Sequence, residues 1–335
     1  MIDKVEKKRL AVLSAIKDAG RPLNGAYLTA ELIAHGFDVS ERTVRLYLQE
    51  MDHDGLTENL GRRGRRITAK GLEELSAARV IEKLGLLSAK IDQITFLMDF
   101  ELTRRTGTVV INTSVLDPRL LALHADKFCR VFEKGLAMGR LMTLLEPGER
   151  IGDLTVPPGH IGVGTVCSVT INGALLQKGI PVHSRFGGLL ELQDGQPTRF
   201  VDIITYDGTT LDPLEVFIRS GMTDYLGAIS TGNGRIGASF REFPSASRHR
   251  VRELAKQLEE IGLGGFMLIG GPARPLLEVP VGEGRVGAVV IGGLNPLAVF
   301  EESGERVLSR ALAGLVEFER LFPYYELEDR LKRIV

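Results

Sequence analysis

Two groups of side chains in this sequence are suited to binding a charged partner or to chemistry. The first is the run Gly-Arg-Arg-Gly-Arg-Arg at 61–66, in which four guanidinium groups share one short turn. Crowded guanidinium groups repel one another, and each offers a planar fork of donors that suits phosphate oxygens. The second is Thr-Val-Cys-Ser at 165–168, where two hydroxyl groups can donate to an anion and a thiol could act as a nucleophile.

The elements that must position the arginines are helices followed by a hairpin. The apolar spacing predicts helices over 3–19, 25–34 and 41–54, with Asn24 and Ser40 as N-caps of the second and third. Residues 56–68 are typical of a β-hairpin whose tip is the arginine run, and Thr68 is placed to cap a fourth helix. This order is that of a winged helix-turn-helix, which we place at 1–75.

The third predicted helix buries one apolar stripe and turns Arg42, Arg45 and Gln49 outward. Such side chains can read base edges in the major groove of DNA, while the arginine hairpin can reach phosphates or the minor groove. The alternatives are a merely solvated helix face, RNA binding, or a domain that docks another protein. The residues that we expect to contact DNA are Ser40, Arg42, Thr43, Arg45, Gln49, Arg62, Arg63, Arg65 and Arg66.

The overall composition is that of an ordinary soluble protein of two or three domains, with 335 residues of which 44% are hydrophobic. The 42 Lys and Arg nearly balance the 43 Asp and Glu, which excludes a uniformly basic nucleic-acid coat. The basic charge is instead local, because 56–72 holds five Lys or Arg against a single Glu.

Several classes of site and location are disfavoured. Two cysteines and six scattered histidines give neither a disulfide scaffold nor a metal-ligand spacing, so we expect no metal and no resident cofactor. The charged N-terminus is no secretory signal, and the longest uncharged stretch, 154–177, is interrupted by Pro and Gly. We therefore expect a cytoplasmic protein with no membrane contact.

Residues from 107 onward contain an internal duplication. When the chain is shifted by 123 positions, 154–172 falls on 277–295 with eight of 19 residues identical. Each copy reads as strand, helix and strand, and the first also carries inserted strands near 189–206. We predict an α/β (α+β) effector-binding and dimerisation domain of two pseudo-symmetric lobes, about 107–228 and 229–335, preceded by a helical bridge at 76–106.

The two copies differ at the polar run. Thr-Val-Cys-Ser of the first copy corresponds to Ala-Val-Val-Ile at 288–291, which favours a ligand site in the first lobe, near the cleft between lobes. Arg185 could clamp a carboxylate, although Arg310 repeats it and a structural role is a rival. Asn172 and Asn295 are also repeated, and helix capping is their favoured role. The candidate effector residues are Thr165, Cys167, Ser168, Asn172, Ser184, Arg185, Gly187 and Gly188.

An enzymatic role is disfavoured. Cys167 has His160 and His183 near it in sequence, but no recognisable Cys-His signature surrounds them, and the Gly-rich nucleotide motifs are absent. The alternative that we keep is a metabolite-binding enzyme or sensor that uses Cys167, with the winged helix serving RNA or protein docking.

The large domain resembles the NrpR family of nitrogen-regulation repressors, and the N-terminal domain resembles the winged helix found ahead of ribonuclease R. The motifs that carry the resemblance are GVGTVCSVTINGALL at 162–176, GIPV at 179–182, RFGG at 185–188 and GGLNPLA at 292–298. The resemblance implies a homodimeric repressor that binds double-stranded operator DNA of nitrogen-assimilation genes and releases it when the dicarboxylate 2-oxoglutarate binds. Some members carry two effector domains, whereas this chain carries one.

If two effector domains form the dimer, they set the separation of two recognition helices, and half-sites on one face of DNA lie about 34 Å apart. An effector weakens DNA binding only if it prefers the conformation in which the helices are wrongly spaced. We expect the bridge helix, 81–98, to transmit this change.

Overall fold

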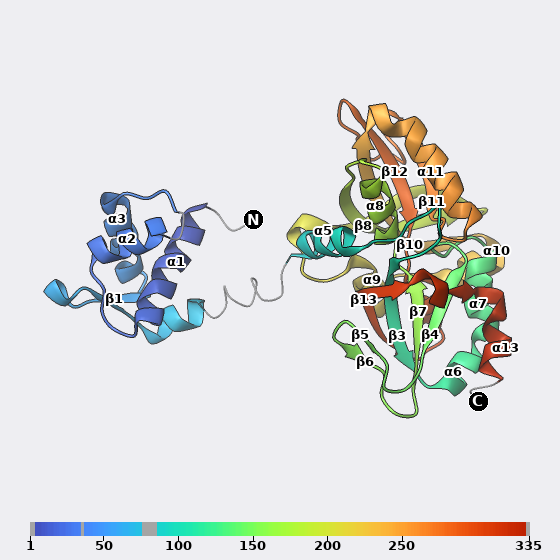
Figure 1. Cartoon of the computed structure of the whole chain (residues 1–335), viewed down its shortest axis with the longest axis horizontal. Helices are drawn as coiled ribbons and strands as arrows, with labels where there is room; N and C mark the ends of the chain where they lie inside the picture. Colours follow the sequence, from blue (N-terminus) through green and yellow to red (C-terminus); the bar gives the residue numbers. More distant parts are fainter. Residues whose placement is uncertain (1–3, 35–36, 76–85, 333–335) are drawn as a thin grey trace. The chain divides into compact units, whose positions relative to one another are not determined.

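The computed structural model describes residues 4–34, 37–75 and 86–332. The chain divides into two compact units, Met1–Leu86 and Leu87–Val335, which are described separately here (Figure 1). Within the described residues, no helix is both long and apolar enough to cross a membrane.

The first unit contains three helices that share one apolar core. They are α1 (Lys4–Ala19), α2 (Gly25–Ala34) and α3 (Glu41–His53). Leu13 and Ile16 of α1 pack in this core with Leu28 of α2 and Leu48 of α3. Both predicted N-caps are present, because the Asn24 side chain accepts from the Tyr27 amide and Ser40 Oγ accepts from the Thr43 amide.

A short hairpin follows α3. Strand β1 (Thr57–Asn59) pairs with β2 (Arg65–Ile67), and the 3₁₀ turn η1 (Gly61–Arg63) joins them. Gly64 is required beside the turn, because its φ is +95° and a Cβ there would lie 2.3 Å from the Leu23 carbonyl oxygen. Thr68 Oγ1 accepts from the Gly71 amide at the start of helical residues 69–75. The unit is the predicted winged helix-turn-helix.

The predicted bridge is described only in part. The helical spacing of the sequence predicts an apolar stripe formed by Ile81, Leu84, Ile91, Ile94, Leu97 and Met98, of which Ile81 and Leu84 lie outside the described residues. Helix α5 (Leu87–Leu97) belongs to the second unit and packs on α8 (Val169–Gln177). Leu97, expected in the apolar stripe, is exposed because the helix ends there, and Met98 turns inward against Gly173 instead.

The second unit is built on two five-stranded sheets. One has the order β13-β3-β7-β4-β14 and the other β11-β12-β10-β8-β9, and all their pairings are antiparallel. The domain is therefore of the α+β type. The strands of the first sheet are β3 (Thr108–Leu116), β4 (Leu141–Leu145), β7 (Ile161–Val166), β13 (Leu308–Glu317) and β14 (Phe322–Pro323). Those of the second are β8 (His183–Gln193), β9 (Gln196–Thr205), β10 (Gly234–Pro244), β11 (Phe266–Pro272) and β12 (Arg285–Ile291).

The two copies of the repeat exchange strands, because β8 and β9 lie in the sheet of the second copy and β13 and β14 in the sheet of the first. By sequence β3, β4, β7 and β8 correspond to β10, β11, β12 and β13. In space β8 of the first copy pairs with β10 of the second, and β13 of the second pairs with β3 of the first. Each sheet thus contains a strand from the other copy. The boundary that we drew between 228 and 229 separates the sequence copies, but it does not separate the sheets.

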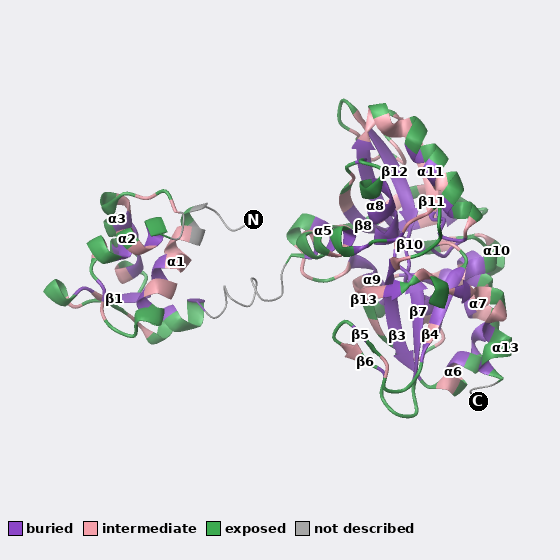
Figure 2. Cartoon of the chain, in the orientation of Figure 1, coloured by how far each residue is buried: buried purple, intermediate pink, exposed green. Residues whose placement is uncertain are grey.

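The helices cover the sheets, and the central strands β3, β7, β10 and β12 form the buried interior, whereas the edge strands β9, β11 and β13 are largely half-buried or exposed (Figure 2). The apolar side chains make two large clusters, one around Phe128, Phe240 and Phe300 and one around Phe100 and Phe243. The remaining elements are α6 (Pro118–Leu123), α7 (Ala125–Glu133), α9 (Pro213–Arg219), α10 (Tyr225–Thr231), α11 (Arg248–Glu260), α12 (Ala298–Glu302), α13 (Leu327–Leu331), β5 (Arg150–Ile151) and β6 (Leu154–Thr155).

Candidate DNA-binding surface and anion site

Helix α3 presents one outward stripe. Val44, Leu48 and Met51 are fully buried on its inner face. At 3.6 residues per turn the opposite face carries positions 42, 46, 49 and 53, and Arg42, Leu46, Gln49 and His53 are all exposed. The three residues of the predicted outward stripe, Arg42, Arg45 and Gln49, are all exposed, and the prediction missed Leu46.

Three of the residues predicted to contact DNA at this helix form hydrogen bonds within the protein. Ser40 Oγ caps the helix and lies 2.8 Å from Thr43 Oγ1, so both hydroxyl groups are engaged at the helix start. Arg45 Nη2 donates to Glu41 Oε1 at 2.6 Å, and this pair lies at the flank of the outward stripe. Arg45 is consequently less available to a base edge than Arg42.

The four arginines of the hairpin are not equivalent, which corrects the idea of four guanidinium groups at one tip. The side chain of Arg65 is only 16% exposed, and its Nε donates to Asp52 Oδ2 at 2.9 Å. This ion pair links the hairpin to α3. Arg66 pairs with Glu58 at 2.8 Å on the surface. Arg62 and Arg63 occupy the turn itself, are exposed, and have no ion-pair partner among the described residues.

In the second unit the most unusual polar group is Arg241 on β10, which sequence reasoning missed. Arg241 is only 2% exposed, although arginine is almost never buried to this extent without a charged partner. Its Nη1 donates to the Ser168 carbonyl at 2.7 Å and to Asn172 Oδ1 at 2.6 Å, and Nη2 donates to Ser168 Oγ at 2.8 Å. Its Nε has no hydrogen-bond partner among the described residues.

No carboxylate in the described part of the chain forms an ion pair with Arg241, and burial lowers the pKa of its guanidinium. A buried charge is costly unless a charge of opposite sign accompanies it. The arrangement is consequently incomplete without an anion, and Arg241 is the centre of the candidate effector site.

Arg241 joins several of the predicted effector residues. Asn172 accepts from Arg241, and its Nδ2 donates to Ser184 Oγ at 3.0 Å. Ser168, Asn172 and Ser184 therefore lie around one guanidinium group. The favoured capping role was wrong for Asn172, which lies inside α8. It was wrong also for Asn295, whose Nδ2 donates to two backbone carbonyls rather than accepting from a helix amide.

Cys167 directly follows β7 and lies close enough to Arg241 for the two groups to interact electrostatically, and Thr165 lies two residues earlier, on β7 itself. Thr165 is buried opposite Asn112, and its Oγ1 has no partner among the described residues. Burial raises the pKa of the Cys167 thiol to about 12, with a smaller contribution of Asp212 and an opposing one of Arg241. A thiol with such a pKa is protonated at neutral pH and is not a nucleophile.

Asp212 and Tyr206 complete the electrostatics of this region. Asp212 caps α9, since its Oδ1 accepts from the Leu214 and Glu215 amides. Burial, and then the neighbouring Glu215, raise the pKa of Asp212 to about 7. Burial also raises the pKa of Tyr206, which Asp212 raises further and Arg241 lowers. At neutral pH the Cys167 thiol and the Tyr206 hydroxyl are therefore uncharged, and neither supplies a negative charge to Arg241.

Arg185 lies outside the group of residues around Arg241, which corrects the prediction that Arg185 and Ser168 belong to one site. Its Nη1 bonds Glu242 Oε1 at 2.8 Å and the Pro280 carbonyl at 2.7 Å. Arg241 and Glu242 are successive residues of β10 and point to opposite faces of the sheet. The repeated Arg310 has a carboxylate partner as well, Glu215 at 4.0 Å, so the arginine that the repeat preserves has a structural role in both copies.

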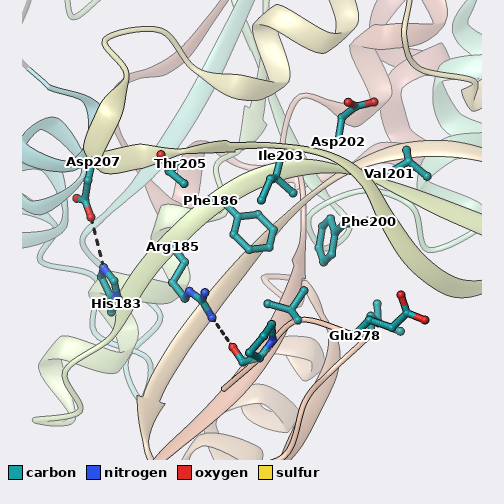
Figure 3. A pocket seen from close by; sticks show the side chains of 13 residues that line it. His183, Arg185, Phe186, Phe200, Val201, Asp202, Ile203, Thr205, Asp207 and Glu278 are labelled. Carbon is teal, nitrogen blue, oxygen red and sulfur yellow. Dashed lines mark hydrogen bonds and ion pairs between the residues drawn. The ribbon is translucent and has the colours of Figure 1, made fainter. Parts of the chain in front are cut away.

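Arg185 instead lines an open cavity of about 700 Å³ between β9 and 277–280. Figure 3 shows Phe186 and Phe200 within it, the pair His183 and Asp207 at one end and Glu278 toward the other. Because Glu242 already neutralises Arg185, this cavity offers no uncompensated positive charge to an anion.

Gly187 and Gly188 serve packing rather than ligand contact. They lie in the middle of β8, between β10 and β9. A Cβ on Gly187 would lie 2.8 Å from Pro213 Cβ, and one on Gly188 would lie 2.7 Å from the Asp202 carbonyl oxygen. Both positions therefore require the absence of a side chain.

Comparison with known proteins agrees with both units. The model of the NrpR regulatory domains NRD1 and 2 matches residues 84–322, and that of the ribonuclease R winged-helix domain matches 10–75. The chain belongs to the NrpR family. It is 31% identical over 326 residues to the global nitrogen regulator NrpRI of Methanosarcina mazei, covering 96% of this chain and 99% of that protein.

Two further relatives are longer. The global nitrogen regulators NrpR of Methanococcus maripaludis and Methanocaldococcus jannaschii are 30% and 31% identical to this chain, which spans 51% and 55% of their lengths. The crystal structure of a nitrogen repressor-like protein from Methanococcus jannaschii superimposes with a TM-score of 0.61 at 28% identity, covering 72% of this chain and 99% of that one. This chain is accordingly a transcriptional regulator with a winged-helix DNA-binding domain.

Proposed function

We propose that this chain represses nitrogen-assimilation genes and that 2-oxoglutarate relieves the repression by binding beside Arg241. The observation that carries the effector half of the proposal is the buried guanidinium group, which has no carboxylate partner in the described part of the chain. An anion at this point would supply the missing charge, and a carboxylate matches the fork of guanidinium donors.

The surrounding groups fit an effector that carries both carboxylate and keto oxygens. Ser168 Oγ, 2.8 Å from Arg241 Nη2, is a hydroxyl group that can donate. Thr165 Oγ1, on the strand that precedes Ser168, is a buried hydroxyl without a partner among the described residues, and we propose that it donates to the effector as well. Asn172 offers an amide that now bridges Arg241 and Ser184. A bound carboxylate would replace Asn172 Oδ1 and the Ser168 carbonyl as acceptors for Arg241, which alters the contacts that hold α8.

Helix α8 connects this change to the DNA-binding unit through the chain. Helix α5 packs on α8, and Gln177 Nε2 donates to the Met98 carbonyl just after α5. Since α5 begins at Leu87, only twelve residues after Leu75, the last described residue of the winged helix, a shift of α8 reaches the connecting segment through one helix. In a homodimer this shift would alter the separation of two α3 helices, for which half-sites lie about 34 Å apart.

For DNA binding, α3 enters the major groove with Arg42 and Gln49 at the bases, and Arg62 and Arg63 of the hairpin contact phosphates. The outward stripe and the unpaired tip support this role.

Fluorescence anisotropy of a labelled duplex tests the proposal. The duplex is selected from a random-sequence pool by the full chain, and 2-oxoglutarate is titrated into the complex. We expect 2-oxoglutarate to release the DNA, and glutarate, which lacks the keto oxygen, to do so only at much higher concentration. A complex that withstands saturating 2-oxoglutarate contradicts the effector, and a pool in which no sequence is enriched contradicts DNA recognition itself.

A further inference from the structure

The outward stripe of α3 contains one apolar side chain, Leu46, between the polar side chains of Arg42 and Gln49. Leu46 is 52% exposed, although Val44, Tyr47 and Leu48 around it are buried. A single exposed leucine is common on protein surfaces and does not by itself indicate a binding site. The position of Leu46 is informative, because it lies four residues after Arg42 and three before Gln49, on the side of the helix opposite the buried face.

Helical geometry places the stripe on one narrow strip of surface. At 100° per residue, positions 42, 46, 49 and 53 fall within about 60° of one another, centred opposite the core. Leu46, Gln49 and His53 also line one shallow depression of the surface. Whatever surface Arg42 and Gln49 approach, Leu46 approaches as well.

The neighbouring charges leave Leu46 in the open part of the strip. Arg45 turns to the flank and bonds Glu41, and Arg9 holds Asp54 at the far end of the depression through an ion pair. The part of α3 that is free of internal ion pairs therefore runs from Arg42 through Leu46 to Gln49.

An apolar side chain in the major groove has one apolar group among the four bases to contact, the 5-methyl of thymine. We infer that Leu46 packs on a thymine methyl group and makes each half-site specific for an A·T pair at that position. The inference rests on the proposed function, in that α3 must enter the major groove. Because Leu46 lies between Arg42 and Gln49, the thymine lies between the base pairs that these two side chains read.

The test compares thymine with deoxyuridine, which pairs identically and lacks only the methyl group. Each thymine of the selected duplex is replaced singly, and binding of the full chain is measured by anisotropy. We expect one position in each half-site at which the replacement raises Kd about fourfold, the effect of one buried methyl. At the other thymine positions the replacement leaves Kd unchanged.

Two variants decide whether Leu46 is responsible. Leu46→Ala should bind the thymine and deoxyuridine duplexes equally, and more weakly than the wild type binds the thymine duplex. Ile33→Ala removes a similarly exposed apolar side chain from α2 and should keep the fourfold preference. Both changes are at the surface, and thermal melting verifies the fold.

Three results would overturn the inference. Either the selected half-sites lack thymine, or the wild type is indifferent to every methyl group, or Leu46→Ala retains the preference. In each case DNA binding itself stands, since the duplex was selected by it. If no duplex is selected, the proposed function fails together with the inference, and docking of a protein on this strip becomes the better explanation of Leu46.

Discussion

Arg241 and Asn112 occupy matching positions in the two sheets. Arg241 on β10 lies opposite Ala288, and Asn112 on β3 lies opposite Thr165. Thr165 and Ala288 coincide when the repeat is shifted by 123 positions. The duplicated framework therefore holds a neutral amide in one sheet and a charged guanidinium in the other.

This difference breaks the symmetry of the framework at the candidate effector site. Asn112 Oδ1 accepts from the amide of Leu312 on β13. Arg241 reaches instead across to Ser168 and Asn172, which belong to the other copy of the repeat. The candidate site thus takes its charge from one copy and its hydroxyl and amide groups from the other.

The hairpin tip should dominate the salt dependence of DNA binding. Arg62→Ala combined with Arg63→Ala removes two exposed cations, and each phosphate contact contributes about 0.9 to the slope of log K against log salt. We expect the slope to fall by about two for each bound copy, with the thermal midpoint unchanged. An unaltered slope between low and moderate salt would place the tip away from DNA.

Arg65 should instead affect stability. Its guanidinium, 16% exposed, bonds Asp52, which also accepts from Thr57 Oγ1. Removing a charge-assisted bond of this kind costs about 1–2 kcal/mol, so Arg65→Ala should lower the midpoint of the winged-helix transition. The matched control is Arg66→Ala, whose surface pair with Glu58 contributes little. Equal midpoints for the two variants in differential scanning calorimetry would contradict the assignment.

Local features of the fold were predictable from sequence, and contacts across the repeat were not. Asn24, Ser40 and Thr68 cap their helices as expected, because a cap depends only on the next few residues. The hairpin was found from its turn, but the inward direction of Arg65 depends on Asp52, thirteen residues earlier. Leu46 was overlooked because polar side chains alone were sought on the outward face.

The centre of the candidate site was missed for a topological reason. Arg241 lies 73 residues after Ser168 and has no counterpart of its own kind in the repeat. Only the exchange of β8 and β13 brings the two copies together at this point. The repeated residues Arg185 and Asn295 attracted notice in the sequence because they recur, and recurrence here reflects shared packing.

Effector affinity should depend on pH through Asp212. Its pKa is raised to about 7, so the carboxyl group is mostly neutral at pH 6 and ionised at pH 8. Since an ionised Asp212 repels a dianion, Kd for 2-oxoglutarate should rise as pH increases through 7. Asp212→Asn keeps a helix cap and removes the titration, so its Kd should be nearly constant over this range. Calorimetry at pH 6, 7 and 8 on both proteins measures this, and parallel profiles would contradict it.

The strand exchange should make the two copies inseparable in folding. A fragment of 107–228 retains β8 but lacks β10, its partner, and its β3 lacks β13. We expect this fragment to show no cooperative unfolding transition in circular dichroism, whereas residues 87–335 unfold in a single transition. A cooperative transition of the short fragment would show that the first copy folds without the exchange.

Calorimetric titration of 2-oxoglutarate into the full chain and two arginine variants tests the central claim most directly. Arg241→Met removes the uncompensated guanidinium, and Arg185→Met removes one that Glu242 already neutralises. Melting curves verify that both variants are folded. The account predicts binding to the wild type and to Arg185→Met with similar Kd, and no measurable binding to folded Arg241→Met. Undiminished binding to Arg241→Met would contradict it, as would loss of binding in Arg185→Met alone.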